Sequence, residues 1–283
     1  MTTVAAALAQ AHRRGVARLD AQLMLARLLA ISRTALIAHD DRALTDDEAE
    51  GWANWLERRA AGEPLAYLLG EKEFCGLRLE VGRGVLVPRP ETELLVEWVS
   101  ALLADLSSAS AGAPGAAPPR VVDLGTGSGA IALAVKSANP LAQVTATDTS
   151  AASLAVARRN AARHGLAIET IETPWWEGLA RRRFEIAVAN PPYVAAGDPH
   201  LEALRHEPLA ALTSGDDGLA ALKAIIGAAP SHLEPGGWLV LEHGFDQAAA
   251  VRGLLAQAGF VAVETRCDLA GLERATGGRR GVA

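Results

Sequence analysis

The chain has 283 residues, of which 50% are hydrophobic and 21% are charged, and its formal net charge is -6 at pH 7. This length suffices for two domains, and the acidic balance excludes a general electrostatic attraction to nucleic acid. There are two distant cysteines without metal-ligand spacing and no run of about 18 apolar residues, so we expect a soluble, cytoplasmic protein without a metal or a membrane contact.

The beginning of the chain predicts a small helical domain over residues 1–70. Apolar residues recur there at helical spacing, and Thr45 followed by Glu48 matches a capping box that opens a helix. Residues 71–87 mix apolar residues with glycines, which is typical of a hairpin, and we interpret them as a linker between domains. Residues 88–283 then make up the larger domain.

The larger domain alternates strands with helices from Arg120 onward. The expected strands span residues 121–124, 144–147, 167–171, 184–189, 238–241 and 260–265, and the expected helices span residues 130–138, 150–164, 219–229 and 247–258. This alternation is typical of a parallel sheet covered on both faces, so we expect a doubly wound, mostly parallel α/β fold. A run of Ser, Ala, Gly and Pro at residues 107–119 is interpreted as a loop before the first strand.

A glycine-rich turn after Asp123 joins the first strand to the first helix. Its residues are Gly125, Thr126, Gly127, Ser128 and Gly129. The glycines let the backbone approach a ligand closely, and Asp148 at the end of the second strand can accept hydrogen bonds from a ribose. A dinucleotide and S-adenosylmethionine both fit this pattern. Asp123 favours S-adenosylmethionine, because a carboxylate attracts its positive charges and would repel a pyrophosphate.

The sequence Asn190, Pro191, Pro192, Tyr193 directly follows the fourth strand. Asn190 offers a side-chain acceptor and donor, and the Pro191 carbonyl is a second acceptor held between two rigid rings. Together they can hold a planar nitrogen that carries two hydrogens, and Tyr193 can stack on the planar group. If the fourth strand lies beside the first, the motif meets the glycine turn. We therefore expect an amide or an aromatic amine to be the group acted upon.

In combination these motifs resemble the release-factor glutamine methyltransferases. The resemblance rests on the glycine turn, the Asn-Pro-Pro-Tyr sequence, residues 87–93 (VPRPETE), residues 73–76 (EFCG), the Glu207–Pro208 pair and residues 215–219 (GDDGL). It implies a class I methyltransferase fold of the Rossmann-like type. It also implies S-adenosylmethionine as methyl donor, S-adenosylhomocysteine as product, and the glutamine of the Gly-Gly-Gln tripeptide of class 1 peptide release factors as methyl acceptor.

The resemblance also implies roles for single residues. The turn from Gly125 to Gly129 would line the methionine moiety, and Asp148 would hold the ribose. Asn190 and Pro191 would hold the glutamine amide, with Tyr193 packed beside it. The N-terminal domain would contact the release factor.

The family has a tryptophan 15 residues before the asparagine, and Trp175 fits that spacing. Because Trp176 is adjacent, the assignment could instead fall on that residue. The acid that usually precedes this tryptophan is replaced by Pro174. Adenine recognition would therefore depend on backbone groups, on Glu172 or on packing.

Three other functions remain as alternatives. An adenine-N6 methyltransferase of nucleic acid would hold the exocyclic amine of adenine through the same acceptors, Asn190 and the Pro191 carbonyl. A nicotinamide-dependent oxidoreductase could use the glycine turn to bind its cofactor. A non-catalytic module could recruit a partner through the N-terminal helices. The basic run at residues 181–183 is interpreted as a solvated surface, so no direct nucleic-acid binding is expected. Glu242 and His243 are candidate proton acceptors for which a packing or solvent role is favoured. We expect a monomer.

Overall fold

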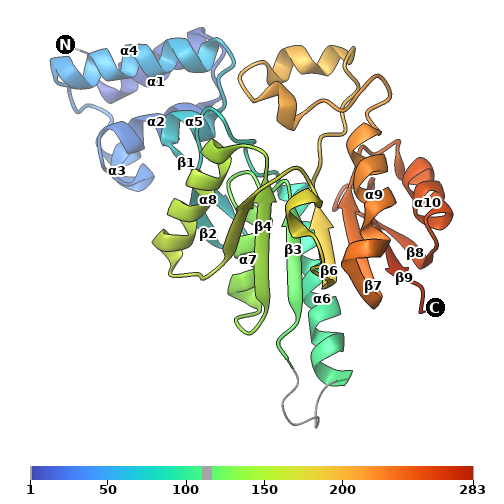
Figure 1. Ribbon diagram of the computed structural model, residues 1–283. Helices are drawn as coiled ribbons and strands as arrows, with labels where there is room; N and C mark the ends of the chain where they lie inside the picture. The colour runs from blue at the N-terminus through green and yellow to red at the C-terminus, as the bar shows by residue number, and fades with distance from the viewer. Residues whose placement is uncertain (1, 110–116, 283) are drawn as a thin grey trace. The chain divides into compact units, whose positions relative to one another are not determined.

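The computed structural model describes residues 2–109 and 117–282, which form two compact units (Figure 1). The first unit consists of Met1–Lys72 and Val81–Arg83, and the second consists of Glu73–Glu80 and Gly84–Ala283. Within the described residues, no helix is both long and apolar enough to cross a membrane.

The first unit is a bundle of short helices. They are α1 (Val4–Arg13), α2 (Arg18–Leu28), α3 (Arg33–Ala38), α4 (Asp46–Ala60) and α5 (Leu65–Leu69). The predicted capping box opens α4, since the Thr45 hydroxyl accepts from Glu48 N and the Glu48 carboxylate accepts from Thr45 N. Trp52 of α4 then packs with Met24 and Leu36 in a core that these helices share.

The second unit is built on a seven-stranded sheet in the order β5-β4-β3-β6-β7-β9-β8, preceded by the hairpin β1-β2. The strands are β1 (Glu71–Phe74), β2 (Leu77–Glu80), β3 (Arg120–Leu124), β4 (Gln143–Asp148), β5 (Glu169–Glu172), β6 (Phe184–Ala189), β7 (Leu233–Glu242), β8 (Phe260–Cys267) and β9 (Glu273–Arg280). Neighbouring strands from β5 to β7 are parallel, and β9 is antiparallel to both β7 and β8. The doubly wound, mostly parallel fold is therefore confirmed.

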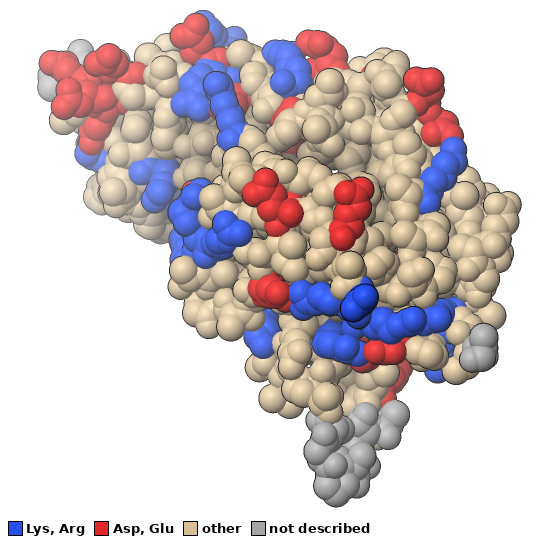
Figure 2. All heavy atoms as spheres, in the orientation of Figure 1, with Lys and Arg blue, Asp and Glu red and all other residues tan. Residues whose placement is uncertain are grey.

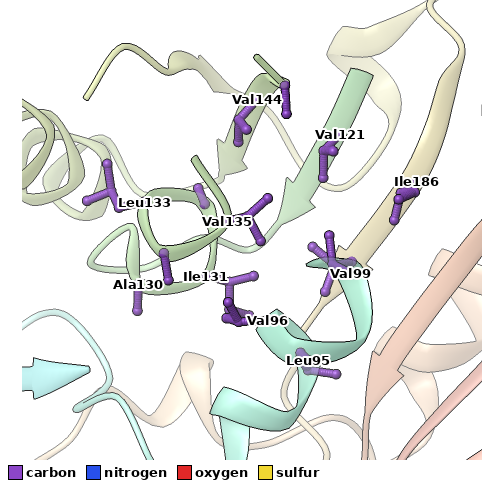
Figure 3. Close-up of a cluster of buried hydrophobic side chains, with 14 of the residues drawn as sticks. Leu95, Val96, Val99, Val121, Ala130, Ile131, Leu133, Val135, Val144 and Ile186 are labelled. Carbon is purple, nitrogen blue, oxygen red and sulfur yellow. The ribbon is translucent and has the colours of Figure 1, made fainter. Parts of the chain in front are cut away.

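Helices cover both faces of this sheet. They are α6 (Glu93–Ala109), α7 (Ala130–Ala138), α8 (Ala151–His164), α9 (Ala220–His232) and α10 (Ala248–Gln257), with the short 3-10 helices η1 (Pro90–Thr92), η2 (Glu177–Leu179), η3 (Pro199–Leu204) and η4 (Leu209–Ala211). On one face, Val96 of α6 and Ile131 of α7 pack with Val121 of β3 and Ile186 of β6 (Figure 3). On the other face, α9 and α10 enclose a second buried cluster.

Strand β9 was absent from the prediction because its sequence has little strand propensity. Glu273–Arg280 combines charged residues with Gly277 and Gly278, which are poor strand formers. Tertiary packing requires the first of these glycines, since a Cβ on Gly277 would lie 2.9 Å from the ring of Trp98. The loop predicted for residues 107–119 is wrong at residues 107–109, which continue α6, and residues 110–116 lie outside the described part of the chain.

The order of the central strands determines where a ligand can bind. Strands β4 and β5 follow β3 on one side of it, whereas the later strands β6 and β7 lie on its other side. The order in which the chain adds strands to the sheet therefore reverses at β3. Leu124 at the end of β3 pairs with Ala189 at the end of β6, which confirms that these two strands are neighbours. The glycine turn and the Asn-Pro-Pro-Tyr sequence therefore emerge side by side at the carboxyl ends of the strands, where open α/β sheets bind their ligands.

Candidate functional site

The glycine turn after β3 needs glycine for conformation and for space. Gly125, Gly127 and Gly129 all have positive φ angles, of 76°, 56° and 85°. A Cβ on Gly125 would lie 3.1 Å from the Trp175 ring, and one on Gly129 would lie 3.1 Å from the Cβ of Ala157. The turn therefore approaches its surroundings more closely than a side chain would allow.

Asp148 ties the turn to the next strand. Its Oδ2 accepts a hydrogen bond from Gly127 N at 2.9 Å, and its Oδ1 accepts one from Ser150 N at 2.8 Å. Each carboxylate oxygen has a further lone pair. Asp148 can thus hold the turn in place and still accept from the hydroxyls of a ligand.

A first cavity of about 300 Å³ lies at this end of the sheet. It is lined by Gly84, Val85, Leu86, Gly125, Gly127, Asp148, Thr149, Ser150, Ser153, Thr173, Trp175, Asn190, Pro192, Pro208, Ala210 and Ala211. Six predicted site residues are among them, namely Gly125, Gly127, Asp148, Trp175, Asn190 and Pro192. Asp123, Thr126, Ser128 and Gly129 are not among them, and all four are buried.

The two adjacent tryptophans have different environments. Trp175 lines the first cavity, with a φ of 40°. Trp176 is buried in the core, where its Nε1 donates to the Ile225 carbonyl at 3.0 Å and its ring stacks on His232. Glu172 does not line the cavity, whereas Thr173 does. The geometry therefore favours Trp175 over Trp176 as the residue that meets a ligand.

Asp123 is a buried carboxyl directly behind the turn. It is 1% exposed, and its Oδ2 accepts from the Thr126 hydroxyl at 2.6 Å and from Ala132 N at 3.2 Å. Its Oδ1 has no hydrogen-bond partner among the residues that the structure describes. Burial is the main cause that raises the pKa of Asp123 to about 7. Because Asp123 does not line the cavity, its charge can act on a bound ligand only across the glycine turn.

Replacing Asp123 by asparagine should stabilise the ligand-free fold above neutral pH. Because the pKa is raised to about 7 in the folded state, this carboxyl contributes stability at low pH that is lost as the pH rises through 7. An asparagine side chain does not ionise, so the variant does not lose stability in this pH range. Since one pKa unit corresponds to about 1.4 kcal/mol, Asp123→Asn should exceed the wild type in unfolding free energy by roughly 2–4 kcal/mol at about pH 8.5, and by less at about pH 5.

Urea denaturation at the two pH values measures this difference. The isosteric side chain keeps an acceptor for Thr126 and Ala132, so the fold should persist. An equal difference at both pH values would show that the carboxyl is not held protonated by burial.

Asn190 and Tyr193 are both fixed by hydrogen bonds to distant parts of the chain. The Nδ2 of Asn190 donates to the hydroxyl oxygen of Thr92 at 3.1 Å. The Tyr193 hydroxyl donates to Oε1 of Glu242 at 3.3 Å, and the Tyr193 carbonyl accepts from Gln247 at 2.9 Å. Burial raises the pKa of the Tyr193 hydroxyl far above its usual range, so it remains a donor. The loop is thus anchored at both ends.

A second cavity of about 230 Å³ lies on the other side of Asn190. It is lined by Leu86, Arg89, Asn190, Pro191, Tyr193, Val194, Leu204, Ala211 and Leu212. Asn190, Leu86 and Ala211 line both cavities. Asn190 is therefore one of three residues that contribute to the walls of both cavities.

Four residues around the second cavity were not predicted to take part in the site. Arg89 forms an ion pair with the buried Glu207, whose other oxygen accepts from Val87 N at 3.0 Å. This pair ties the segment of η3 and η4 to the residues before η1. Thr92 and Gln247 hold Asn190 and Tyr193. The proline-rich motif contains Arg89 and Thr92, but nothing local in the sequence indicates their partners.

Figure 2 shows a band of Lys and Arg side chains below the middle of the view, with Asp and Glu side chains beside it. Arg120 forms ion pairs with Glu185 and Glu234, and Arg182 forms one with Glu169. Within the basic run at residues 181–183, the pair with Glu169 thus balances the charge of Arg182.

Known proteins resemble this chain over nearly its whole length. A family model described as the PrmC N-terminal domain matches residues 1–70, and one described as the methyltransferase small domain matches residues 100–210. A release factor glutamine methyltransferase of Bordetella pertussis is 49% identical over 267 residues, which cover 93% of this chain and 95% of that protein. One from Xylella fastidiosa is 49% identical over 267 residues, covering 93% of this chain and 94% of the relative.

A solved structure shares the fold at low sequence identity. It is a 16S rRNA methyltransferase of T. thermophilus in complex with AdoMet and guanosine, with a TM-score of 0.53 and 21% identity. The match covers 74% of this chain and 49% of that one.

Proposed function

Because this chain belongs to the release factor glutamine methyltransferase family, we propose that it methylates the side-chain amide nitrogen (N5) of the glutamine in the Gly-Gly-Gln sequence of class 1 peptide chain release factors. S-adenosylmethionine is the methyl donor and S-adenosylhomocysteine the product. The observation that carries the proposal is the position of Asn190, which lines both cavities and can face a donor in one and an amide in the other.

The first cavity suits S-adenosylmethionine, which when bound supplies an activated methyl group on a positively charged sulfur. Gly125 and Gly127 let the backbone approach the methionine moiety, and Asp148 accepts from the ribose hydroxyls. Asp123 provides negative charge and an unpartnered oxygen behind the turn. Trp175 packs against the bound molecule from the cavity wall. No metal ion takes part in this assignment.

The second cavity suits a primary amide. An amide nitrogen is a weak nucleophile, because its lone pair is delocalised into the carbonyl. Hydrogen bonds from its two N–H groups to Asn190 Oδ1 and to the Pro191 carbonyl fix its direction and favour electron density on nitrogen as charge develops. Positioning of this kind contributes roughly 7–11 kcal/mol. Tyr193 also lines this second cavity, and Pro192 lines the first cavity.

The helical N-terminal domain, residues 1–70, contacts the release factor in this proposal, residues 71–87 form the linker, and residues 88–283 carry the methyl transfer. The enzyme acts as a monomer in the cytoplasm, where translation ends, and binds no nucleic acid directly and no membrane. Direct transfer leaves the amide proton to be taken up by water.

Methyl transfer from radiolabelled S-adenosylmethionine to a purified class 1 release factor tests the function. We expect label in the wild-type release factor and none in one whose Gly-Gly-Gln glutamine is replaced by alanine. Adenine-containing DNA and RNA, assayed in parallel, should stay unlabelled. Label in the nucleic acid and not in the release factor would instead support the adenine-N6 alternative.

A further inference from the structure

We propose that Glu207 is a positioning residue, which together with Arg89 holds Leu86 and Ala211 in place at the boundary between the two cavities. The inference rests on the proposed function, in which the methyl donor occupies the first cavity and the glutamine amide the second. Glu207 itself lines neither cavity, so it acts through the residues that it holds.

The walls of the two cavities share Leu86, Asn190 and Ala211. A methyl group that leaves the sulfur in the first cavity for the nitrogen in the second must therefore cross beside these residues. Direct transfer needs the reacting atoms in line, and a displacement of about 1 Å can lower the rate roughly 10²-fold. Whatever fixes Leu86 and Ala211 therefore controls the space that is available to the transferred group.

The Glu207 carboxylate binds a segment that lies far away in the sequence. Its Oε2 accepts a hydrogen bond from Val87 N at 3.0 Å, and its Oε1 accepts one from the guanidinium of Arg89. The Val87 nitrogen belongs to the same planar peptide unit as the Leu86 carbonyl. The hydrogen bond to Val87 therefore fixes the backbone at Leu86.

The backbone after Glu207 leads directly to the other side of the boundary. Pro208 follows, and its carbonyl accepts from Ala211 N at 2.9 Å, which closes the short helix η4. The carbonyl of Leu212 then accepts from Val194 N at 2.9 Å, directly after the Asn-Pro-Pro-Tyr sequence. The residues on both sides of the carboxylate are therefore part of one hydrogen-bonded frame.

Burial makes both hydrogen bonds of Glu207 necessary. Its side chain is 2% exposed, whereas that of Arg89 is 34% exposed. A buried carboxylate is costly unless donors satisfy it, and here Arg89 supplies a positive charge while Val87 supplies a main-chain N–H. Two motifs that the proposed function leaves without a role, residues 87–93 and the Glu207–Pro208 pair, thus meet at this contact.

Two substitutions of Glu207 remove its hydrogen bonds in steps. Glu207→Met removes both acceptors at about the same side-chain volume, whereas Glu207→Gln keeps one acceptor. We expect kcat for release-factor methylation to fall roughly 10²-fold in Glu207→Met and about 10-fold in Glu207→Gln, with little change in KM for the release factor. Binding of S-adenosylhomocysteine, measured by calorimetry, should weaken far less, because Asp148 and the glycine turn are untouched. A wild-type kcat in Glu207→Met would overturn the proposal.

Glu185→Met is the matched control. Glu185 also binds one main-chain N–H and one guanidinium, since its Oε2 accepts from Arg120 N at 2.7 Å and its Oε1 from the Arg120 side chain at 2.8 Å. It lines neither cavity, so its replacement should leave kcat unchanged. Equal losses in Glu207→Met and Glu185→Met would contradict a specific positioning role.

Arg89→Met tests whether Arg89, which lines the second cavity, acts through Glu207. If it does, the double variant Arg89→Met/Glu207→Met should lose no more activity than Glu207→Met alone. Losses in kcat that multiply would show that Arg89 acts on the substrate independently of Glu207, which contradicts the proposal.

Hydrogen exchange of the ligand-free enzyme separates this inference from the proposed function. Pro88 and Pro90 have no N–H, so the buried Val87 amide contributes a large share of the exchange in a peptide over residues 85–90. We expect this peptide to exchange roughly 10-fold faster in Glu207→Met than in the wild type. Unchanged exchange refutes the positioning role. A wild type that fails to methylate release factors contradicts only the proposed function.

Discussion

Asn190→Ala is expected to lower kcat for release-factor methylation by roughly 10²–10³-fold, the loss typical of removing one group that stabilises developing charge. The alanine removes the acceptor for the substrate amide and leaves the Pro191 carbonyl alone to orient the nitrogen. Because the first cavity keeps its other walls, binding of S-adenosylhomocysteine should weaken far less than kcat falls. Steady-state kinetics and calorimetry measure the two effects.

Asn139→Ala is the matched control for this variant. Asn139 is also partly buried and its Nδ2 also donates to a hydroxyl, that of Ser100 at 3.1 Å, but it caps the end of α7 and lines neither cavity. Its replacement should leave kcat unchanged. Comparable activity of Asn190→Ala and Asn139→Ala would remove Asn190 from the catalytic machinery.

Gly218→Ala should be almost as damaging, through the backbone of Tyr193. Gly218 has a φ of 70°, and a Cβ there would lie 2.2 Å from the Tyr193 carbonyl oxygen and 2.8 Å from Gln247 Nε2. The loop that carries Asn190 must shift, and a misplacement of about 1 Å can lower the rate roughly 10²-fold. We also expect a loss of about 2–5 kcal/mol in unfolding free energy, from left-handed strain and overpacking together.

Gly271→Ala is a control that introduces the left-handed backbone strain of Gly218→Ala without its steric clash. Gly271 has a φ of 78°, but nothing lies within 4 Å of its Cβ position. Its replacement should cost only about 1–2 kcal/mol and leave kcat unchanged. If the two alanine variants have the same activity, the contact between Gly218 and Tyr193 does not support the site.

The fold class could be predicted because it depends on short, regular patterns. Apolar runs such as residues 184–189 and 121–124 are long enough to indicate buried strands, and Ser150 and Gly165 mark the start and end of α8. The hairpin β1-β2 was expected within residues 71–87 for the same reason. Among the strands that the structure describes, β9 was missed, because packing against Trp98 overrides its propensity there.

The residues of the site could also be predicted wherever they lie next to one another in the sequence. Asp123 to Gly129 and Asn190 to Tyr193 each form one turn, and a turn has few possible conformations. Six of the residues predicted there and at Asp148 and Trp175 line the first cavity. Their binding roles remain predictions that the variants above test.

The sequence by itself determined the alternation of strands and helices, the glycine turn and the Asn-Pro-Pro-Tyr corner, because each depends on residues close together in the chain. Only the tertiary structure decided which tryptophan meets the cavity, that Asp123 is buried behind the turn, and that Thr92 reaches Asn190. The physical reason is that these contacts join residues separated by as many as 98 positions. Strand order brings such residues together, and hydrophobic periodicity, which reports only the face of a strand or helix that is buried, contains no information about that order.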